Sequence, residues 1–297
     1  MAPSLWPELP FDSWRETRDT LHRYAQIVGK IQLETTPRVS HFWNVALTLT
    51  PRGLSTSAMP YHGRTFSIAF DFVEHALVMR TRDGGERKLA LVPRTVAEFY
   101  ADVVADLAAL GVRVPIWDHP VEIFRDAVPF SEDHLHRAYD RAWVERYFRV
   151  LTSTAEALGE FRARFIGKAS PVGLYWGTFD LAAARYSGRR APSPPSGTIE
   201  SEAYSHELSE AGFWPGDVRY EHAAFYSLHA PAPDGFDRAK VRPAEAFWQP
   251  SMSCFLLPYD AVRAAASPRD ALLDFYESAY EAGANLAGWN RAELERP

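Results

Sequence analysis

The sequence predicts an α+β protein made of two pseudo-repeated lobes, each a mainly antiparallel sheet with flanking helices. Bulk composition is the first reason, because the 297 residues are 46% hydrophobic and 24% charged, which is typical of a folded chain with a substantial core. The second reason is that segments of period-two alternation, such as RTFSIAFDF at 64–72, are interleaved with capped segments of helical periodicity. The third is that this order of elements occurs twice along the chain.

Motifs in the two halves match in sequence and in order. RYAQIVGK at 23–30 resembles FRARFIGK at 161–168, and Trp43 follows the first motif as Trp176 follows the second. Each half then ends with an apolar strand, a proline and a helix containing Phe-Tyr. We therefore predict an internal duplication. It has three parts: a first repeat over 1–111, a connecting segment over 112–139, and a second repeat over 140–297 with an inserted segment at 189–221.

Helix boundaries in the first half are marked by capping boxes and glycines. The boxes begin at Ser13 and Thr95, and Gly29 and Gly111 are the predicted ends of the two helices. The predicted strands between them cover 42–50, 64–72 and 87–92, with turns at 62–63 and 83–85.

The second half repeats this plan around an insertion. Asp140 is the predicted cap of a helix that runs to about residue 165, and Ser267 followed by Pro268 starts the last long helix. The predicted strands cover 172–186, 222–230 and 253–258.

Charge and composition exclude several classes of protein. A net charge of −6 disfavours nucleic acid as a partner, since such binding requires a basic face. The sequence contains no run of 18 uncharged apolar residues, so no membrane span is predicted. The N-terminal residues lack the pattern of a signal peptide, and we therefore expect a cytoplasmic protein. Cys254 is the single cysteine, which excludes an internal disulfide. The sequence does not specify an oligomeric state.

The segment AYSHELSEAGFWPG at 203–216 concentrates polar and aromatic residues within the insertion. We predict a short helix that starts within TIESEAYSHELSEAGFW at 198–214 and is ended by Gly212, in which His206 lies one turn from Glu202 and from Glu210. Two readings stay open. The segment is a solvated helix face, or it is an acid–base site in which neighbouring carboxylates raise the pKa of His206.

The functional reading assigns roles to eight residues. We predict that the protein is an enzyme acting on a small polar or anionic metabolite in an aromatic-lined cleft between the lobes. The alternative is a non-catalytic module that binds a small molecule or a protein. The predicted catalytic residues are His206, Glu207 and Glu210, and the predicted substrate-binding residues are Trp176, Trp214, Arg189, Lys168 and Tyr204.

No cofactor or metal is assigned from the sequence. Standard zinc spacings such as H-E-x-x-H are missing, and FIGKAS at 165–170 lacks the first glycine of a phosphate-binding loop, because that position is Arg162. Carboxylates and an imidazole on one helix face would suit a divalent metal, but further ligands would have to come from elsewhere in the chain.

Six motifs together resemble a bacterial family of proteins, number five-nine-nine-six among the domains of unknown function. They are WPELP at 6–10, QIVGK at 26–30, FIGKASP at 165–171, YWGTFDLAAARYSGRRAP at 175–192, EAYSHELSEAGFWPG at 202–216 and LLPYDAVR at 256–263. The resemblance covers nearly the whole chain and implies no known activity. One departure is GLYWG at 173–177, where the family pattern leads us to expect a histidine.

Overall fold

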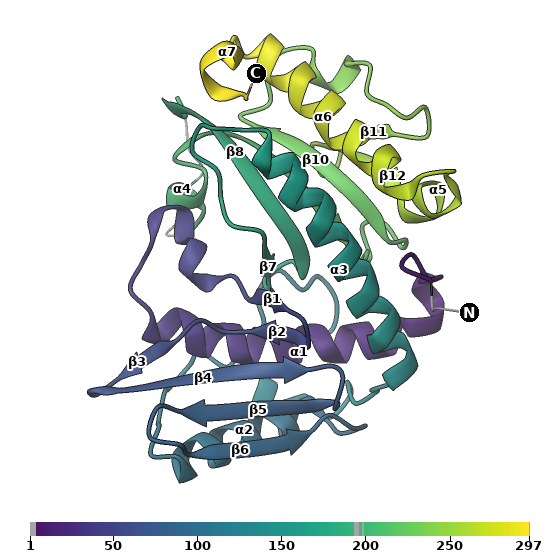
Figure 1. The fold of residues 1–297 in the computed structure, drawn as a ribbon. Coiled ribbons are helices and arrows are strands. Elements are labelled where there is room, and N and C mark those ends of the chain that lie inside the picture. Colours follow the sequence, from purple (N-terminus) through teal and green to yellow (C-terminus); the bar gives the residue numbers. More distant parts are fainter. Residues whose placement is uncertain (1–3, 193–195, 198, 297) are drawn as a thin grey trace.

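The computed structural model describes residues 4–192, 196–197 and 199–296. In this part of the chain, helices accompany two six-stranded antiparallel sheets, one in each half (Figure 1). The predicted α+β class with two sheet-containing lobes is therefore confirmed.

In the first half, two long helices flank a sheet of short strands. The elements are α1 (Phe11–Thr35), η1 (Ser40–Val45), β1 (Thr48–Thr50), β2 (Gly53–Ser55), β3 (Met59–Tyr61), β4 (Arg64–Asp71), β5 (Ala76–Thr81), β6 (Glu86–Ala90) and α2 (Val96–Ala109). The strand order is β1-β2-β4-β5-β6, and β3 pairs with β4 through the predicted turn at 62–63. In the view of Figure 1, α1 and α2 lie behind this sheet.

In the second half, helices cover one face of the sheet and leave the other face to the site described below. After η2 (Phe130–Glu132) in the connecting segment come α3 (Arg141–Ala163), β7 (Gly173–Tyr175), β8 (Asp180–Arg190), α4 (Glu200–Ala203), β9 (His206–Trp214), β10 (Ala224–Ala230), η3 (Phe236–Arg238), β11 (Phe247–Gln249), β12 (Cys254–Pro258), α5 (Tyr259–Ala264), α6 (Pro268–Leu286) and α7 (Arg291–Leu294). The strand order is β11-β12-β10-β9-β8-β7. Helices α3 and α6 pack side by side across one face of this sheet (Figure 1).

The two halves share a core and a short stretch of backbone pairing. Leu47 and Leu174 exchange two backbone hydrogen bonds of 2.9 and 2.8 Å, which join the segment before β1 to β7. One cluster of buried hydrophobic side chains extends through both halves. Within it Trp14 of α1 packs on Tyr147 of α3 with ring centroids 5.1 Å apart. Burial of this shared apolar surface holds the halves together.

Local capping signals placed two helices correctly. Thr95 forms a complete capping box with Glu98 at the start of α2, and Asp140 accepts hydrogen bonds from the first backbone N–H groups of α3. These side chains satisfy donors that a helix leaves unpaired at its N-terminus.

The limits predicted for the first helix are wrong. It begins at Phe11, directly after Pro10, and continues to Thr35, so neither the cap at Ser13 nor the stop at Gly29 exists. Gly29 has a packing role instead, because a Cβ atom there would lie only 2.2 Å from the ring of Trp176. The glycine therefore allows the second half to pack directly on the backbone of α1.

The helix predicted within 198–214 and ended by Gly212 is also wrong. Only one helical turn, α4, precedes the long strand β9, and Gly212 lies inside that strand. The acidic residues and the histidine are spaced as on a helix, but the segment forms a strand because β9 is hydrogen-bonded on both sides, to β8 and to β10. Residues 193–195 and 198 of the predicted insertion lie outside the described part of the chain.

Candidate functional site

A cavity of about 290 Å³ lies on the face of the second sheet that α3 and α6 leave uncovered. Its walls come from η1, from Val121 and Glu122 of the connecting segment, from β7, β8 and β9, and from α4 with the adjoining Tyr204. Both halves and the segment between them therefore build this space, which we call the central cavity. Its volume is near the lower end of the range of small-molecule pockets.

Two carboxyl groups, those of Asp180 and Glu210, line one wall of the central cavity, and a phenol is bonded to both. The hydroxyl group of Tyr226 lies 2.5 Å from Oδ2 of Asp180 and 2.8 Å from Oε1 of Glu210. Asp180 also accepts a hydrogen bond from the hydroxyl group of Thr178. The three groups come from three adjacent strands, and Gly212 leaves the space over β9 through which the Tyr226 ring reaches Asp180.

This arrangement retains a proton. A phenol has one hydrogen and donates to one acceptor at a time, so the second short contact is favourable when the other carboxyl group is protonated. Burial and the charge of Asp180 raise the pKa of Glu210 to about 7. Burial also raises the pKa of Asp180. At neutral pH the two acids therefore behave as one coupled group that takes up and releases a proton.

Aromatic rings form most of the remaining wall. They belong to Trp43, Tyr175, Trp176, Tyr186 and Tyr204. Trp176 is held firmly, because its indole N–H donates to the carbonyl of Val45 at 2.8 Å while its ring lies on Gly29. The charge of Glu210 is the largest cause of the raised pKa of Tyr204, which places that phenol next to the carboxyl pair.

A histidine and a lysine meet at the other end of the central cavity. His41 is 5% exposed, and its Nδ1 lies 2.9 Å from the carbonyl oxygen of Ala203, so that nitrogen carries the hydrogen. Its Nε2 then accepts from Lys168 at 2.8 Å. Burial, with a further contribution from Lys168, lowers the pKa of His41, which keeps the ring neutral. The φ of His41 is +60°, a costly backbone conformation of the kind found at functional sites.

Two further carboxylates lie beside the cavity opening. Glu122 and Glu200 are both exposed residues that line the central cavity. The carboxylate of Glu122 lies so close to Gly177 that a side chain there would collide with it. The residue as a whole is exposed, but its carboxyl group is enclosed against Gly177, and this burial together with the charges of Asp180 and Glu200 raises the pKa of Glu122.

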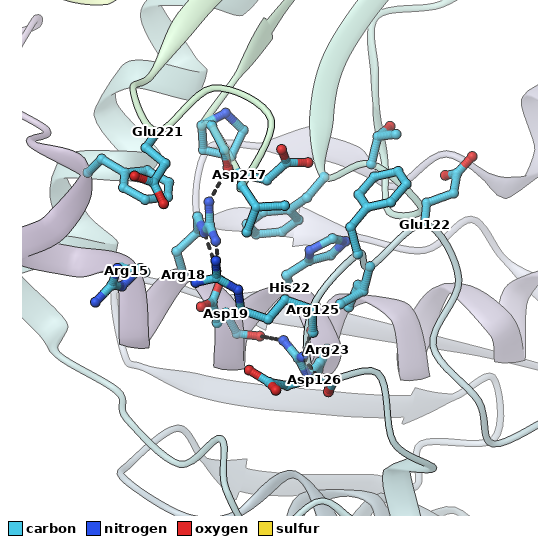
Figure 2. A pocket seen from close by; sticks show the side chains of 18 of the residues that line it. Arg15, Arg18, Asp19, His22, Arg23, Glu122, Arg125, Asp126, Asp217 and Glu221 are labelled. Carbon is cyan, nitrogen blue, oxygen red and sulfur yellow. Dashed lines mark hydrogen bonds and ion pairs between the residues drawn. The ribbon is translucent and has the colours of Figure 1, made fainter. Parts of the chain in front are cut away.

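A smaller cavity of about 60 Å³ lies on the other side of Glu122, between α1 and the loop after β9 (Figure 2). Figure 2 shows several arginines here, and two of them, Arg18 and Arg23, are paired within the protein. Arg18 donates to the carbonyl of Gly216 and pairs with Asp19, and Arg23 pairs with Asp133 at 3.1 Å. This cavity has room for a few water molecules and is far below the volume of a small-molecule pocket.

The structure brings three of the eight sequence-predicted residues into the central cavity: Glu210, Trp176 and Tyr204. Lys168 and His206 lie at its edge beside His41, since the two histidine rings are 5.4 Å apart. Burial and the charge of Lys168 lower the pKa of His206, whereas a helical pairing with glutamates would have raised it.

The other three predicted residues lie elsewhere. Glu207 points to the opposite face of β9 from Glu210, because side chains alternate along a strand. There it pairs with Arg189 at 2.7 Å, and Arg189 also donates to the carbonyl of Ala287 near the end of α6. Trp214 lines the smaller cavity. The catalytic and binding roles predicted for these residues stay predictions.

Sequence reasoning missed Asp180, Tyr226, His41, Tyr186 and Glu122. One indication of this site was available in the sequence: Asp180, an acidic residue, directly precedes the apolar run LAAA of a buried strand. Recognising the cluster also requires the strand order, because Asp180 and Tyr226 lie far apart in the sequence and meet only across β9. Among the described residues, no group of three or more His, Cys, Asp or Glu side chains is placed to hold a metal ion.

These features define the class of protein: two antiparallel sheets, with an aromatic and acid-rich cavity where the halves meet. None of the described helices combines the length and the apolar character needed to cross a membrane. The chain belongs to the family of unknown function DUF5996, whose model matches residues 6–296. The resemblance found in the sequence motifs is thus confirmed. Searches of curated proteins and of solved structures give no match.

Proposed function

We propose that the protein is an enzyme that performs acid–base chemistry on a small molecule bound in the central cavity. The observation that carries this proposal is the hydroxyl group of Tyr226 lying between Asp180 and Glu210, within 2.8 Å of both. A carboxyl group that exchanges its proton near pH 7 is suited to act as both general acid and general base. Structural ion pairs do not explain this cluster, because no described Lys or Arg contacts either acid.

Each member of the cluster has a separate role in this proposal. Glu210 transfers the proton to or from the ligand, and burial raises its pKa to about 7 for this purpose. Asp180 accepts hydrogen bonds from Thr178 and Tyr226 and so holds the negative charge. Tyr226 connects the two acids, so that a proton leaving Glu210 is compensated by a shift of its hydroxyl hydrogen.

The aromatic wall supports the same reading. Large rings around Glu210 exclude water, which strengthens electrostatic interactions with a bound ligand and limits proton exchange with solvent. His206 and His41 lie at the far end of the cavity. The Nε2 atom of His41 already accepts a hydrogen bond from Lys168 at 2.8 Å, so this nitrogen is not free to act as a base. We therefore assign proton transfer to Glu210 and leave His206 as a residue of the cavity edge.

Untargeted metabolite profiling tests this proposal. The purified protein would be incubated with a metabolite extract, and mass spectrometry would record which compounds are consumed or formed. We expect Glu210→Gln to slow turnover by about 10²- to 10⁴-fold, the usual contribution of a general acid–base group. Tyr226→Phe should slow it by less, because the carboxyl groups remain. Glu156→Gln, an exposed glutamate of α3, is the charge-matched control and should leave turnover unchanged.

Two outcomes would decide against an acid–base enzyme. Turnover that Glu210→Gln leaves unchanged would remove the central residue of the proposal. Ligand-induced stabilisation without any consumed compound would instead support the alternative prediction of a non-catalytic binding module.

A further inference from the structure

We propose that the ligand of the central cavity is a small organic cation, either an amine or a quaternary ammonium compound. This inference rests on the proposed function in that it concerns the same cavity and names the substrate class. It differs from the anionic ligand expected from the sequence, which depended on Arg189 and Lys168 as anchors.

The charges lining the central cavity are one-sided. Asp180, Glu210, Glu122 and Glu200 all line it, while its described lining residues include no Lys and no Arg. The single basic group in the lining is His41, whose pKa is lowered by burial, so it does not balance the acids. An anionic ligand would meet repulsion from the ionised carboxylates, whereas a cation would be attracted to them.

Lys168 lies at the cavity edge, bonded to His41 at 2.8 Å, and two arginines near the cavity are engaged outside it. Arg219, whose charge reaches Asp180 and Glu122, is bound to Asp217 at 2.8 Å. Arg189 is bound to Glu207 on the opposite face of β9. The acids of the cavity therefore lack a close protein counter-ion, which leaves a cationic position for a ligand to fill.

The aromatic wall suits a cation as well. Indole and phenol rings attract ammonium groups over their faces, more strongly where water is excluded. Two rings of this wall already hold a cation, because the ammonium group of Lys168 lies 5.3 Å from the ring centre of Trp43 and 5.4 Å from that of Tyr186. Lys168 is exposed at the cavity edge, and Lys30 lies 6.0 Å from the ring centre of Trp176. Among the described residues, no Lys or Arg lies over the rings of Tyr175 and Tyr204, which leaves these two faces for a ligand.

Binding of a cation should be linked to a proton. A positive charge beside Glu210 favours its ionised form, so a cation that binds below pH 7 displaces the proton of this acid. The titratable and charged groups that face Glu210 are Asp180, Tyr226, Tyr204, Tyr175, Tyr186 and Cys254. The tyrosines and the thiol have raised pKa values and stay neutral at pH 5–8, which leaves the carboxyl pair as the source of the linked proton. Farther along the cavity, the pKa of His41 is lowered and that of Glu122 is raised.

Matched pairs of compounds test the ligand class. Isothermal titration calorimetry would compare choline with its neutral carbon isostere, dimethylbutanol, and putrescine with butanediol. We expect the charged member of at least one pair to bind at least tenfold more tightly than its neutral partner. As the pH is raised towards 7, the affinity of the cation should increase by up to tenfold per pH unit, and above pH 7 it should level off. Below pH 7, one proton should be released per molecule bound.

Two substitutions control the result. Glu210→Gln should weaken binding of the cation and abolish the proton release, because an amide does not titrate. Tyr204→Leu should weaken it by several-fold, while Tyr204→Phe should retain most of the affinity, which separates a role of the ring from loss of folding.

The outcomes also distinguish the two proposals. Neutral compounds that bind as tightly as the cations, or an absence of binding by choline and putrescine at millimolar concentration, would overturn the ligand class. The acid–base function would then still be decided by the effect of Glu210→Gln on metabolite turnover. Unchanged turnover in that variant together with selective cation binding would overturn the enzyme and keep the binding site.

Discussion

Replacing Glu210 with glutamine should make the free energy of unfolding less dependent on pH. The folded protein keeps a proton on this acid up to about pH 7, whereas an unfolded glutamate releases it near pH 4.5. Between these values the folded state binds more protons than the unfolded state, so raising the pH through this window destabilises the wild-type protein. Glutamine has nearly the same shape and does not ionise, so the variant lacks this loss of stability.

The two pKa values set the size of the effect. They lie about 2.5 pH units apart, and each unit corresponds to about 1.4 kcal/mol, which gives an upper limit of about 3 kcal/mol. The relevant quantity is the difference between variant and wild type at pH 8 minus the same difference at pH 4. Any cost of the new amide that does not depend on pH cancels in this comparison.

Urea unfolding followed by circular dichroism at pH 4–8 would measure the difference. The control is Glu156→Gln, an exposed position on α3 whose difference from wild type should stay constant across the range. A change of less than about 0.5 kcal/mol for Glu210→Gln would refute the reasoning, because it would mean that this acid ionises in the folded protein as readily as in the unfolded chain.

Three further predictions concern positions outside the carboxyl pair. Gly29→Ala should destabilise the fold by about 1–3 kcal/mol, because the added Cβ atom would lie 2.2 Å from the ring of Trp176. Gly159→Ala in α3 should instead stabilise the fold by about 0.5–1 kcal/mol, because no described atom lies within 4 Å of the added Cβ. Thermal unfolding of the two variants and the wild type measures both effects. His229 is 3% exposed, neither ring nitrogen has a hydrogen-bond partner among the described residues, and burial lowers its pKa to about 4. The folded ring resists the proton that an unfolded histidine accepts, so the wild type should lose up to about 3 kcal/mol as pH falls from 6.5 to 4, and urea titrations of His229→Leu should lack this loss. Glu207→Gln breaks an ion pair with an exposed arginine and should cost under about 1 kcal/mol while leaving choline binding intact in calorimetry; lost binding would place Glu207 in the site after all.

Part of the fold could be read from local sequence because the physics that decides it is local. Thr95 and Asp140 cap helices through side chains that reach backbone donors within three residues, and these helix starts were predicted correctly. The turn at 62–63 joins β3 to β4, because two successive residues with positive φ make a tight hairpin. The alternation at 64–72 likewise identified β4.

The site depended on information that local sequence does not carry. The segment from His206 to Trp214 has acids and a histidine at helical spacing, yet hydrogen bonding on both edges makes it a strand. In a strand, Glu210 and Glu207 face opposite sides of the sheet. The prediction that both are catalytic residues of one site could therefore be right for only one of them. Asp180 and Tyr226 become partners only through the strand order, which a single sequence does not specify.

The turn of α1 around Gln26 connects the central cavity to the packing of α1. Gln26 is fully buried, and its amide donates to the carbonyls of Val121 and Gly177 while its oxygen accepts from the Val121 backbone, so one side chain clamps three distant stretches of chain. Val121 and Gly177 line the central cavity, so Gln26 ties two of its walls to α1. Under the proposed function, a ligand bound there would stabilise the native chain by mass action, and its supply would slow proteolysis of the protein.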